Sequence, residues 1–221
     1  MTARGPRRPT KRIPVRHEEV SSDARPGKVP VKARVISDPR TMRALAHPVR
    51  LALLEALGRE GELTATRAAE ILDESPGNMS WHLQTLAKYG YVEESGGGKG
   101  RSRPWRIASV ANRFLTAAED PEVEAAGEAL ESVFADQAFS RLRQWWTRRA
   151  TYPYAWRNAA FATDQMGYLT AEEMAELGEE VAALFGRYRD RVLDKELRPA
   201  ESKPVKLVAF GHPIPPTPSG N

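Results

Sequence analysis

The chain contains no cysteine among its 221 residues. Disulfides, thiolate metal ligands and cysteine nucleophiles are therefore excluded, and we expect a cytoplasmic protein. No uninterrupted apolar run approaches the ~20 residues that a membrane-spanning helix needs. The first residues are basic and proline-rich, without the apolar segment of a secretory signal.

The motifs of common catalytic sites are also missing. There is no Gly-rich phosphate loop, no paired-histidine motif and no Ser-x-x-Lys motif, so we expect no enzyme activity. The four histidines, His17, His47, His82 and His212, are scattered without an i,i+4 pair. Since sensing of transition metals needs clustered histidine, cysteine or carboxylate ligands, we expect neither a metal site nor another cofactor.

Charge is distributed unevenly along the chain. Residues 1–36 have a net charge of +7, residues 37–110 of +1 and residues 111–198 of −5. This asymmetry indicates that the basic N-terminal half binds a polyanion and that the acidic C-terminal half has another function.

Residues 1–36 are rich in Arg, Lys and Pro and poor in large apolar side chains. Such a segment cannot bury enough surface to offset its ordering entropy, which predicts a disordered basic arm. Two interpretations stay equally open. The arm either touches DNA phosphates, or it is a solubilising tail or an over-extended gene start.

A helical pattern begins at Asp38-Pro39, a plausible cap and first turn. One face of a single helix ending near Gly58 and Gly61 would carry Met42, Leu45, Ala46, Val49, Leu53 and Ala56. A second stripe, Ala44, Leu51 and Leu54, lies nearly opposite. A helix that is apolar on two faces is expected to contact both its own domain and another helix or subunit.

Two further helices and a hairpin follow. Thr64 is placed to cap a helix with a narrow alanine-rich face, and Ser75 to cap the next one, which Gly90 closes. A strand starts at Tyr91-Val92, a basic glycine-rich loop spans 96–103, and the strand returns over 104–108. Three helices and a hairpin predict a winged helix-turn-helix domain over residues 37–110.

The helix over residues 76–89 is the candidate recognition helix. Met79, Leu83 and Leu86 cluster on one side and should anchor it. Residues 75–92 contain no Asp or Glu, and the opposite side carries amides, hydroxyls and a lysine, which suits the major groove of DNA. The predicted DNA contacts on this helix are Ser75, Gly77, Asn78, Ser80, Trp81, His82, Gln84, Thr85 and Lys88.

Two of these residues have competing interpretations. Trp81 either packs on sugar or thymine methyl groups, which we favour slightly, or covers a neighbouring element. His82 lies on the flank of the apolar side, so a structural histidine is favoured over a base contact. In the wing, Lys99, Arg101 and Arg103 are predicted to reach the minor groove or the backbone. Arg106 faces DNA or solvent, and Glu93 and Glu94 are expected to face away.

Residues 111–198 form a predicted helical region, so the fold class is mainly α with a small β-wing. A weak helical segment spans 109–119, a long helix opens at Asp120-Pro121, and another opens at Thr170 with Glu173 completing a capping box. The tail over 199–221 includes a candidate edge strand at 205–210.

Seven aromatic residues fall within the 24 residues from Trp145 to Tyr168. They indicate either a dimerisation core or a pocket for a flat or apolar effector. The candidate pocket consists of Trp145, Trp146, Tyr154, Trp156 and Tyr168, with Arg148, Arg149, Arg157 or Asn158 at its polar end.

The stretches MRALAHPVRLALLEAL, TATRAAEIL and SPGNMSWHLQTLAKYGYVEE resemble the ArsR/SmtB-type winged helix-turn-helix transcriptional regulators. The likeness is specific over about residues 38–108. GGGKGRSRPWRI resembles the wing of an actinobacterial branch with a long helical C-terminal region. YLTAEEMAEL, RYRDR and PVKLVAFGHPIP resemble the tail of that branch.

This resemblance implies a homodimer that binds operator DNA, with recognition residues within Ser75–Lys88 and a wing over Lys99–Arg103. Ser80 and His82 stand at the polar positions of the family motif. We expect a repressor, with a low-specificity chromatin-like protein as the alternative. The residues assigned to dimerisation are Ala44, Leu51, Leu54, Leu130, Phe134, Leu142, Leu177, Val181 and Leu184.

Overall fold

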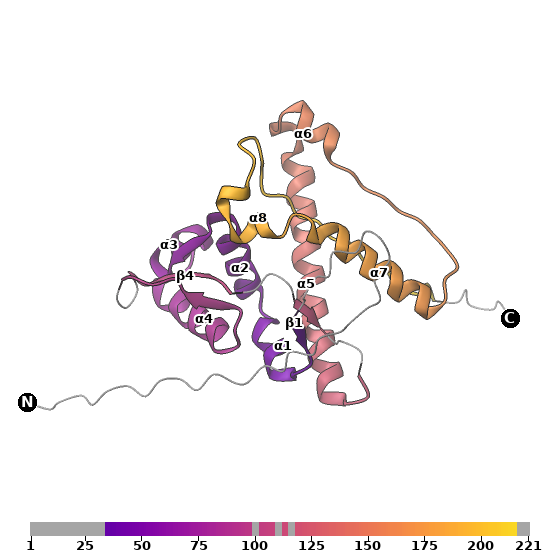
Figure 1. Cartoon of the computed structure of the whole chain (residues 1–221), viewed down its shortest axis with the longest axis horizontal. Helices are drawn as coiled ribbons and strands as arrows, with labels where there is room; N and C mark the ends of the chain where they lie inside the picture. Colours follow the sequence, from indigo (N-terminus) through magenta and orange to yellow (C-terminus); the bar gives the residue numbers. More distant parts are fainter. Residues whose placement is uncertain (1–33, 99–101, 109–111, 115–117, 216–221) are drawn as a thin grey trace, which may run out of the picture.

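The computed structural model describes residues 34–98, 102–108, 112–114 and 118–215. Figure 1 shows a small globular unit formed by α1 to α4 and the wing, with the long helix α5 against it. Of the remaining helices, α6 lies at the far end of α5, α7 extends away from α5, and α8 lies beside α2. The predicted fold class is confirmed: a mainly helical chain with a small antiparallel sheet and a long C-terminal helical region. None of the described helices is long and apolar enough to cross a membrane.

The single helix predicted from Asp38 is two helices, α1 (Pro39–Leu45) and α2 (Pro48–Glu60). Proline disfavours the helical conformation in the residue before it, and His47 is extended, with φ −152°. The bend changes the two predicted stripes. Both Ala44 and Leu51 are buried in the same core as Met42, because α1 and α2 point in different directions.

The caps predicted for α3 (Ala65–Leu72) and α4 (Pro76–Lys88) are confirmed. The Thr64 hydroxyl accepts from the Arg67 N–H at 3.1 Å, and the Ser75 hydroxyl from the Asn78 N–H at 3.1 Å. Asp73, with φ 54°, turns the chain between the two helices. Each cap satisfies an amide that the helix leaves unpaired, which fixes where the helix starts.

The wing is a three-stranded antiparallel sheet in the order β2 (Glu62–Thr64), β4 (Pro104–Ile107), β3 (Val92–Glu94). The predicted hairpin is confirmed as β3 and β4, and Gly90, with φ 75°, ends the preceding helical segment as expected. The strand β2 was not predicted. It pairs Leu63 with Trp105, and both side chains are buried.

A second, two-stranded parallel sheet pairs β1 (Arg34–Ile36) with β5 (Asn112–Phe114). Two predictions are therefore wrong in part. The basic arm does not extend to residue 36, because Ile36 is buried in the core. Residues 112–114 are a strand, not part of a helix over 109–119. Residues 1–33, 109–111 and 115–117 lie outside the described residues.

The helix α5 (Pro121–Arg148) opens at the predicted position, with Asp120 accepting from the Glu122 N–H at 2.8 Å. Its first turns belong to the core of the helix-turn-helix unit, where Ala126 and Leu130 are buried. The Arg43–Glu122 ion pair, at 2.7 Å, joins it to α1. Figure 1 shows the rest of α5 extending well beyond α1.

Beyond α5 come η2 (Arg149–Thr151), α6 (Tyr154–Ala159), α7 (Ala171–Gly186), α8 (Asp190–Leu193) and η3 (Lys195–Leu197). The capping box of Thr170 and Glu173 is confirmed. The expected strand over 205–210 is absent from the described residues. That segment is irregular, and its Phe210 ring stacks on Phe139 with centroids 5.8 Å apart.

The chain returns to the helix-turn-helix unit through Arg198. Its guanidinium donates to the carbonyls of Gly58 and Arg59, each at 3.1 Å, at the end of α2. It also donates to the carbonyls of Arg191 at 2.6 Å and Val192 at 3.2 Å. Since the last carbonyls of a helix lack partners within it, Arg198 caps α2 and ties α8 to it.

Candidate nucleic-acid interface

The apolar side of α4 holds the helix in the unit as predicted. Met79, Leu83 and Leu86 are fully buried among α2, α3 and the wing. Fully burying a leucine or methionine side chain contributes about 1.5–3 kcal/mol each. This anchoring leaves the opposite side of α4 facing outward.

The outward side of α4 carries most of the predicted DNA contacts. Trp81 is 57% exposed. Ser75, Gly77, Gln84 and Lys88 are also exposed. Asn78, Ser80 and Thr85 are half-buried. The structure therefore brings these eight predicted residues together on one helix.

Hydrogen bonds already order this surface. The Gln84 amide donates to the Ser80 hydroxyl at 3.3 Å, and the Thr85 hydroxyl donates to the Trp81 carbonyl at 2.9 Å. The Asn78 amide donates to the Glu74 carboxylate at 2.8 Å. Glu74 stands just before the carboxylate-free stretch, and its hydrogen bond uses one of the two N–H groups of the Asn78 amide.

His82 does not lie on the outward side. It is 2% exposed, so in this conformation it has no surface to offer DNA. We therefore correct the prediction that His82 contacts DNA. Its position is that of a structural histidine. The Trp81 ring stands edge-on against the His82 ring with centroids 4.8 Å apart. Trp81 thus covers His82 on one side and keeps its other surface free.

The buried His82 lies against the half-buried His47. Their ring centroids are 4.9 Å apart, and His82 Nδ1 is buried with no hydrogen-bond partner in the described part of the chain. Burial lowers the pKa of His82, and the neighbouring His47 and Arg50 lower it further, while Glu74 acts in the opposite direction. The pKa of His47 is also lowered, by burial first and then by Arg50, against a smaller opposite effect of Glu74.

In the wing, the two glutamates do not face away as predicted. Arg103 forms an ion pair with Glu94, and Arg106 Nε donates to Glu93 at 2.9 Å. The register of β3 and β4 explains the Arg106 pair, because it places Glu93 directly opposite Arg106. Lys99 and Arg101 lie outside the described residues.

The residues assigned to dimerisation fall into two groups. Ala44, Leu51 and Leu130 are buried within the chain, and Leu54 and Phe134 pack half-buried against the same core. They have little surface to offer a partner in this conformation. Of the assigned residues in the outer half of α5 and in α7, Leu142, Leu177 and Leu184 are exposed, and Val181 is half-buried between the last two.

The predicted effector pocket is not assembled. Trp146, Tyr154 and Tyr168 are 61%, 72% and 97% exposed, and Trp145 packs edge-on against Tyr152 instead. Of the proposed polar end, Arg157 lies over the Tyr154 ring, 5.9 Å from its centroid. Figure 1 explains the dispersal, because the segment between α6 and α7 runs from the far end of α5 to the outer end of α7.

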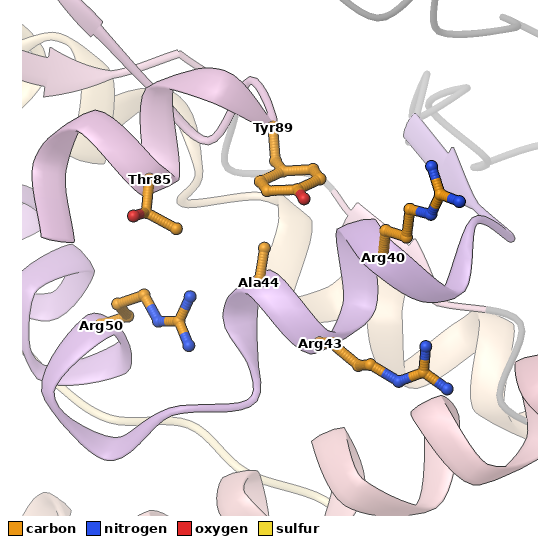
Figure 2. A pocket seen from close by; sticks show the side chains of 6 residues that line it. All are labelled: Arg40, Arg43, Ala44, Arg50, Thr85 and Tyr89. Carbon is orange, nitrogen blue, oxygen red and sulfur yellow. The ribbon is translucent and has the colours of Figure 1, made fainter. Parts of the chain in front are cut away.

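A pocket of about 280 Å³ lies between α1, α2 and α4. Figure 2 shows its six lining side chains, Arg40, Arg43, Ala44, Arg50, Thr85 and Tyr89. Three of the six are arginines and none is acidic. None of these arginines was predicted as a site residue. The sequence does contain a signal for them, because three arginines fall within the eleven residues 40–50, which include the bend at Ala46-His47.

The order α2, α3, α4 and then the β3–β4 hairpin, with α4 presenting a polar outward side, defines a winged helix-turn-helix, a class of DNA-binding domain. A protein family described as "Helix-turn-helix domain" matches residues 45–94, which agrees with that assignment.

No curated protein matches the chain. Among solved structures, the chain is similar to a double mutant of ZitR from Lactococcus lactis in apo form. The identity is 16% and the TM-score 0.27, over 65% of this chain and 83% of that chain. A likeness at that level supports no conclusion about this chain. Among the described residues, no three His, Asp or Glu side chains are grouped so that they could hold a metal ion.

Proposed function

We propose that this protein is a sequence-specific transcriptional regulator that binds operator DNA as a homodimer and acts as a repressor, without sensing a metal. The observation that carries the proposal is the outward side of α4. It is free of carboxylates from residue 75 to 92, and it projects from a rigidly anchored helix.

The geometry of α4 supports reading of base edges. Gln84 is exposed at the middle of the helix, and its amide can accept and donate to adenine in the major groove. Ser80, which accepts from Gln84, holds that amide in place. Lys88 and the amides at the start of α4 supply contacts to phosphates, which position the helix without reading sequence.

Exposed apolar side chains support the homodimer. Phe139, Leu142 and Trp146 are exposed on α5, and Leu177 and Leu184 on α7. Large exposed apolar side chains are surface that a partner would cover. A second copy of the chain is the proposed occupant, and it would bring two α4 helices to half-sites about 10 bp apart, one turn of DNA.

The test compares two duplexes at physiological salt, one from the region upstream of the protein's own gene and one of random sequence. A specific regulator should prefer one duplex by at least about 10³-fold. A ratio near one would instead favour the low-specificity chromatin-like alternative. Failure to retard any duplex at low salt would contradict DNA binding and indicate a winged helix used for protein contacts.

A further inference from the structure

Arg50 occupies an unusual position at the start of α2. Its Nε is buried and has no hydrogen-bond partner among the described residues, and Figure 2 shows its guanidinium directed into the pocket, between Thr85 and Ala44. The residues that line the pocket include no carboxylate that could pair with it. Burial lowers the pKa of Arg50, an effect that Tyr89 and Tyr91 partly oppose.

A half-buried guanidinium without a carboxylate partner is costly to maintain. Taking an arginine out of water costs free energy unless a counter-charge or hydrogen bonds compensate. Arg43 is satisfied differently, because its guanidinium turns away toward α5 and pairs with Glu122 at 2.7 Å. Arg40 is exposed at the rim. Among the three arginines that line the pocket, Arg50 is the one whose guanidinium is directed into it.

We propose that the pocket between α1, α2 and α4 binds a tetrahedral oxyanion of the phosphate type, held by the planar fork of Arg50. Two parallel N–H groups of a guanidinium match two phosphate oxygens. The Thr85 hydroxyl lies on the α4 wall and can turn from the Trp81 carbonyl to the anion. Arg40, at the rim, adds positive potential.

The phosphate can come from two sources. One is a phosphodiester of the DNA backbone, since Thr85 borders both the pocket and the outward side of α4. This source rests on the function proposed above, and the pocket would then fix how deeply α4 enters the groove. The other source is a free phosphate-bearing small molecule, for which inorganic phosphate is the simplest probe.

The first arm of the test uses the full chain without DNA. Inorganic phosphate is titrated at constant ionic strength against chloride, and binding is followed by the shift in melting temperature. We expect saturable stabilisation that Arg50→Gln abolishes. Arg59→Gln is the matched control, because it removes an exposed arginine from the same helix.

A second variant covers the case in which Arg50→Gln fails to fold. Thr85→Glu places a carboxylate beside the Arg50 guanidinium and should block phosphate by pairing with it. Gln84→Glu adds the same charge one residue away on the outward side and should leave the phosphate response intact. Loss of the response in both glutamate variants would show a general charge effect and overturn the site.

The second arm measures duplex binding as a function of salt. If the anion is a DNA phosphate, Arg50→Gln weakens binding to all sequences by about tenfold, roughly the value of one charge-assisted hydrogen bond. It also reduces the slope of log affinity against log salt by about 0.9 relative to Arg59→Gln.

The outcomes of the two arms separate the sources. If Arg50→Gln loses both the phosphate response and duplex affinity, the pocket binds a backbone phosphate of DNA. If Arg50→Gln loses the phosphate response alone, the pocket binds a free small anion. That conclusion stands even if the protein binds no DNA. If Arg50→Gln behaves like Arg59→Gln in both arms and Thr85→Glu behaves like Gln84→Glu in the phosphate titration, the pocket is not an oxyanion site.

Discussion

His47 and His82 lie behind the exposed Trp81 with their ring centroids 4.9 Å apart. In this position, protonation of either ring lowers the stability of the fold. His47 Nδ1 accepts from the Val49 N–H at 3.2 Å and so caps α2. Protonation of that nitrogen would remove the cap. Protonation of His82 would place a charge in the core below the recognition helix.

We therefore expect the free energy of unfolding to fall as the solution is acidified. Both pKa values are lowered in the folded state, so the unfolded chain binds more protons below about pH 6.5. Stability is complete above that pH and is lost as the pH falls toward the folded pKa values, at up to about 1.4 kcal/mol per pH unit for each histidine. Urea unfolding between pH 7.5 and 5 measures this slope.

Replacing His82 with a residue that does not titrate should flatten the slope. His82→Phe keeps a ring against Trp81, and its pH dependence is compared with that of His212→Gln, which removes an exposed histidine from the tail. If the free energy of unfolding of His82→Phe depended on pH as steeply as that of the wild-type protein, His82 would not govern the acid sensitivity.

Gln84→Ala should relax sequence preference. The exposed amide is placed to read a base edge, and a bidentate pair discriminates against the wrong base by about 1–3 kcal/mol. Affinity for the preferred duplex should fall toward that for a mismatched one, while random DNA is bound as before. Gln165→Ala makes the same change in the exposed segment before α7 and should alter neither affinity. An equal loss on all duplexes would make Gln84 a backbone contact.

Glu94→Gln should strengthen binding to DNA of any sequence. The change frees Arg103 from its ion pair and removes a negative charge from the wing. The slope of log affinity against log salt should steepen by up to about 0.9. Removing Lys99, Arg101 and Arg103 together should do the opposite on all sequences.

Glu180→Gln changes the net charge equally on the exposed helix α7 and serves as the control for Glu94→Gln. If the triple wing variant lost only its preference between sequences, the roles assigned to wing and helix would be reversed.

Leu177→Glu combined with Leu184→Glu should convert a dimer into a monomer. Both side chains are about half exposed on one side of α7, at 50% and 48%, and charges there would oppose burial against a second copy. Ala175→Glu adds a charge on another side of the same helix and should leave the mass unchanged. Light scattering after size exclusion gives the mass, and a wild-type monomer would contradict the dimer itself.

The local order of the chain was predictable where short-range chemistry decides it. Thr64, Ser75 and Thr170 cap the helices that they were expected to cap, because capping needs only a hydroxyl and the next few amides. Met79, Leu83 and Leu86 are buried because their spacing matches a helical turn. These features require no knowledge of the rest of the fold.

Predictions failed where the answer depended on distant partners or on one overlooked residue. Pro48 breaks the first helix, a local signal that was outweighed by the continuous apolar pattern around it. The strand β2 is only three residues long and exists because β4 pairs with it. Glu93 meets Arg106 across the sheet, a contact that follows from register and cannot be read along the chain.

The helix α5 joins the helix-turn-helix unit to the C-terminal helices, together with the Arg198 contacts to α2. It is unbroken over 28 residues, or about 42 Å at 1.5 Å per residue. Its first turns are packed in the core against α1, which also walls the Arg50 pocket together with α4. Its outer half is also held to α2 by the Arg141–Glu55 ion pair at 3.1 Å. We therefore expect a partner bound along the outer half of α5 to alter the orientation of α4 through these contacts.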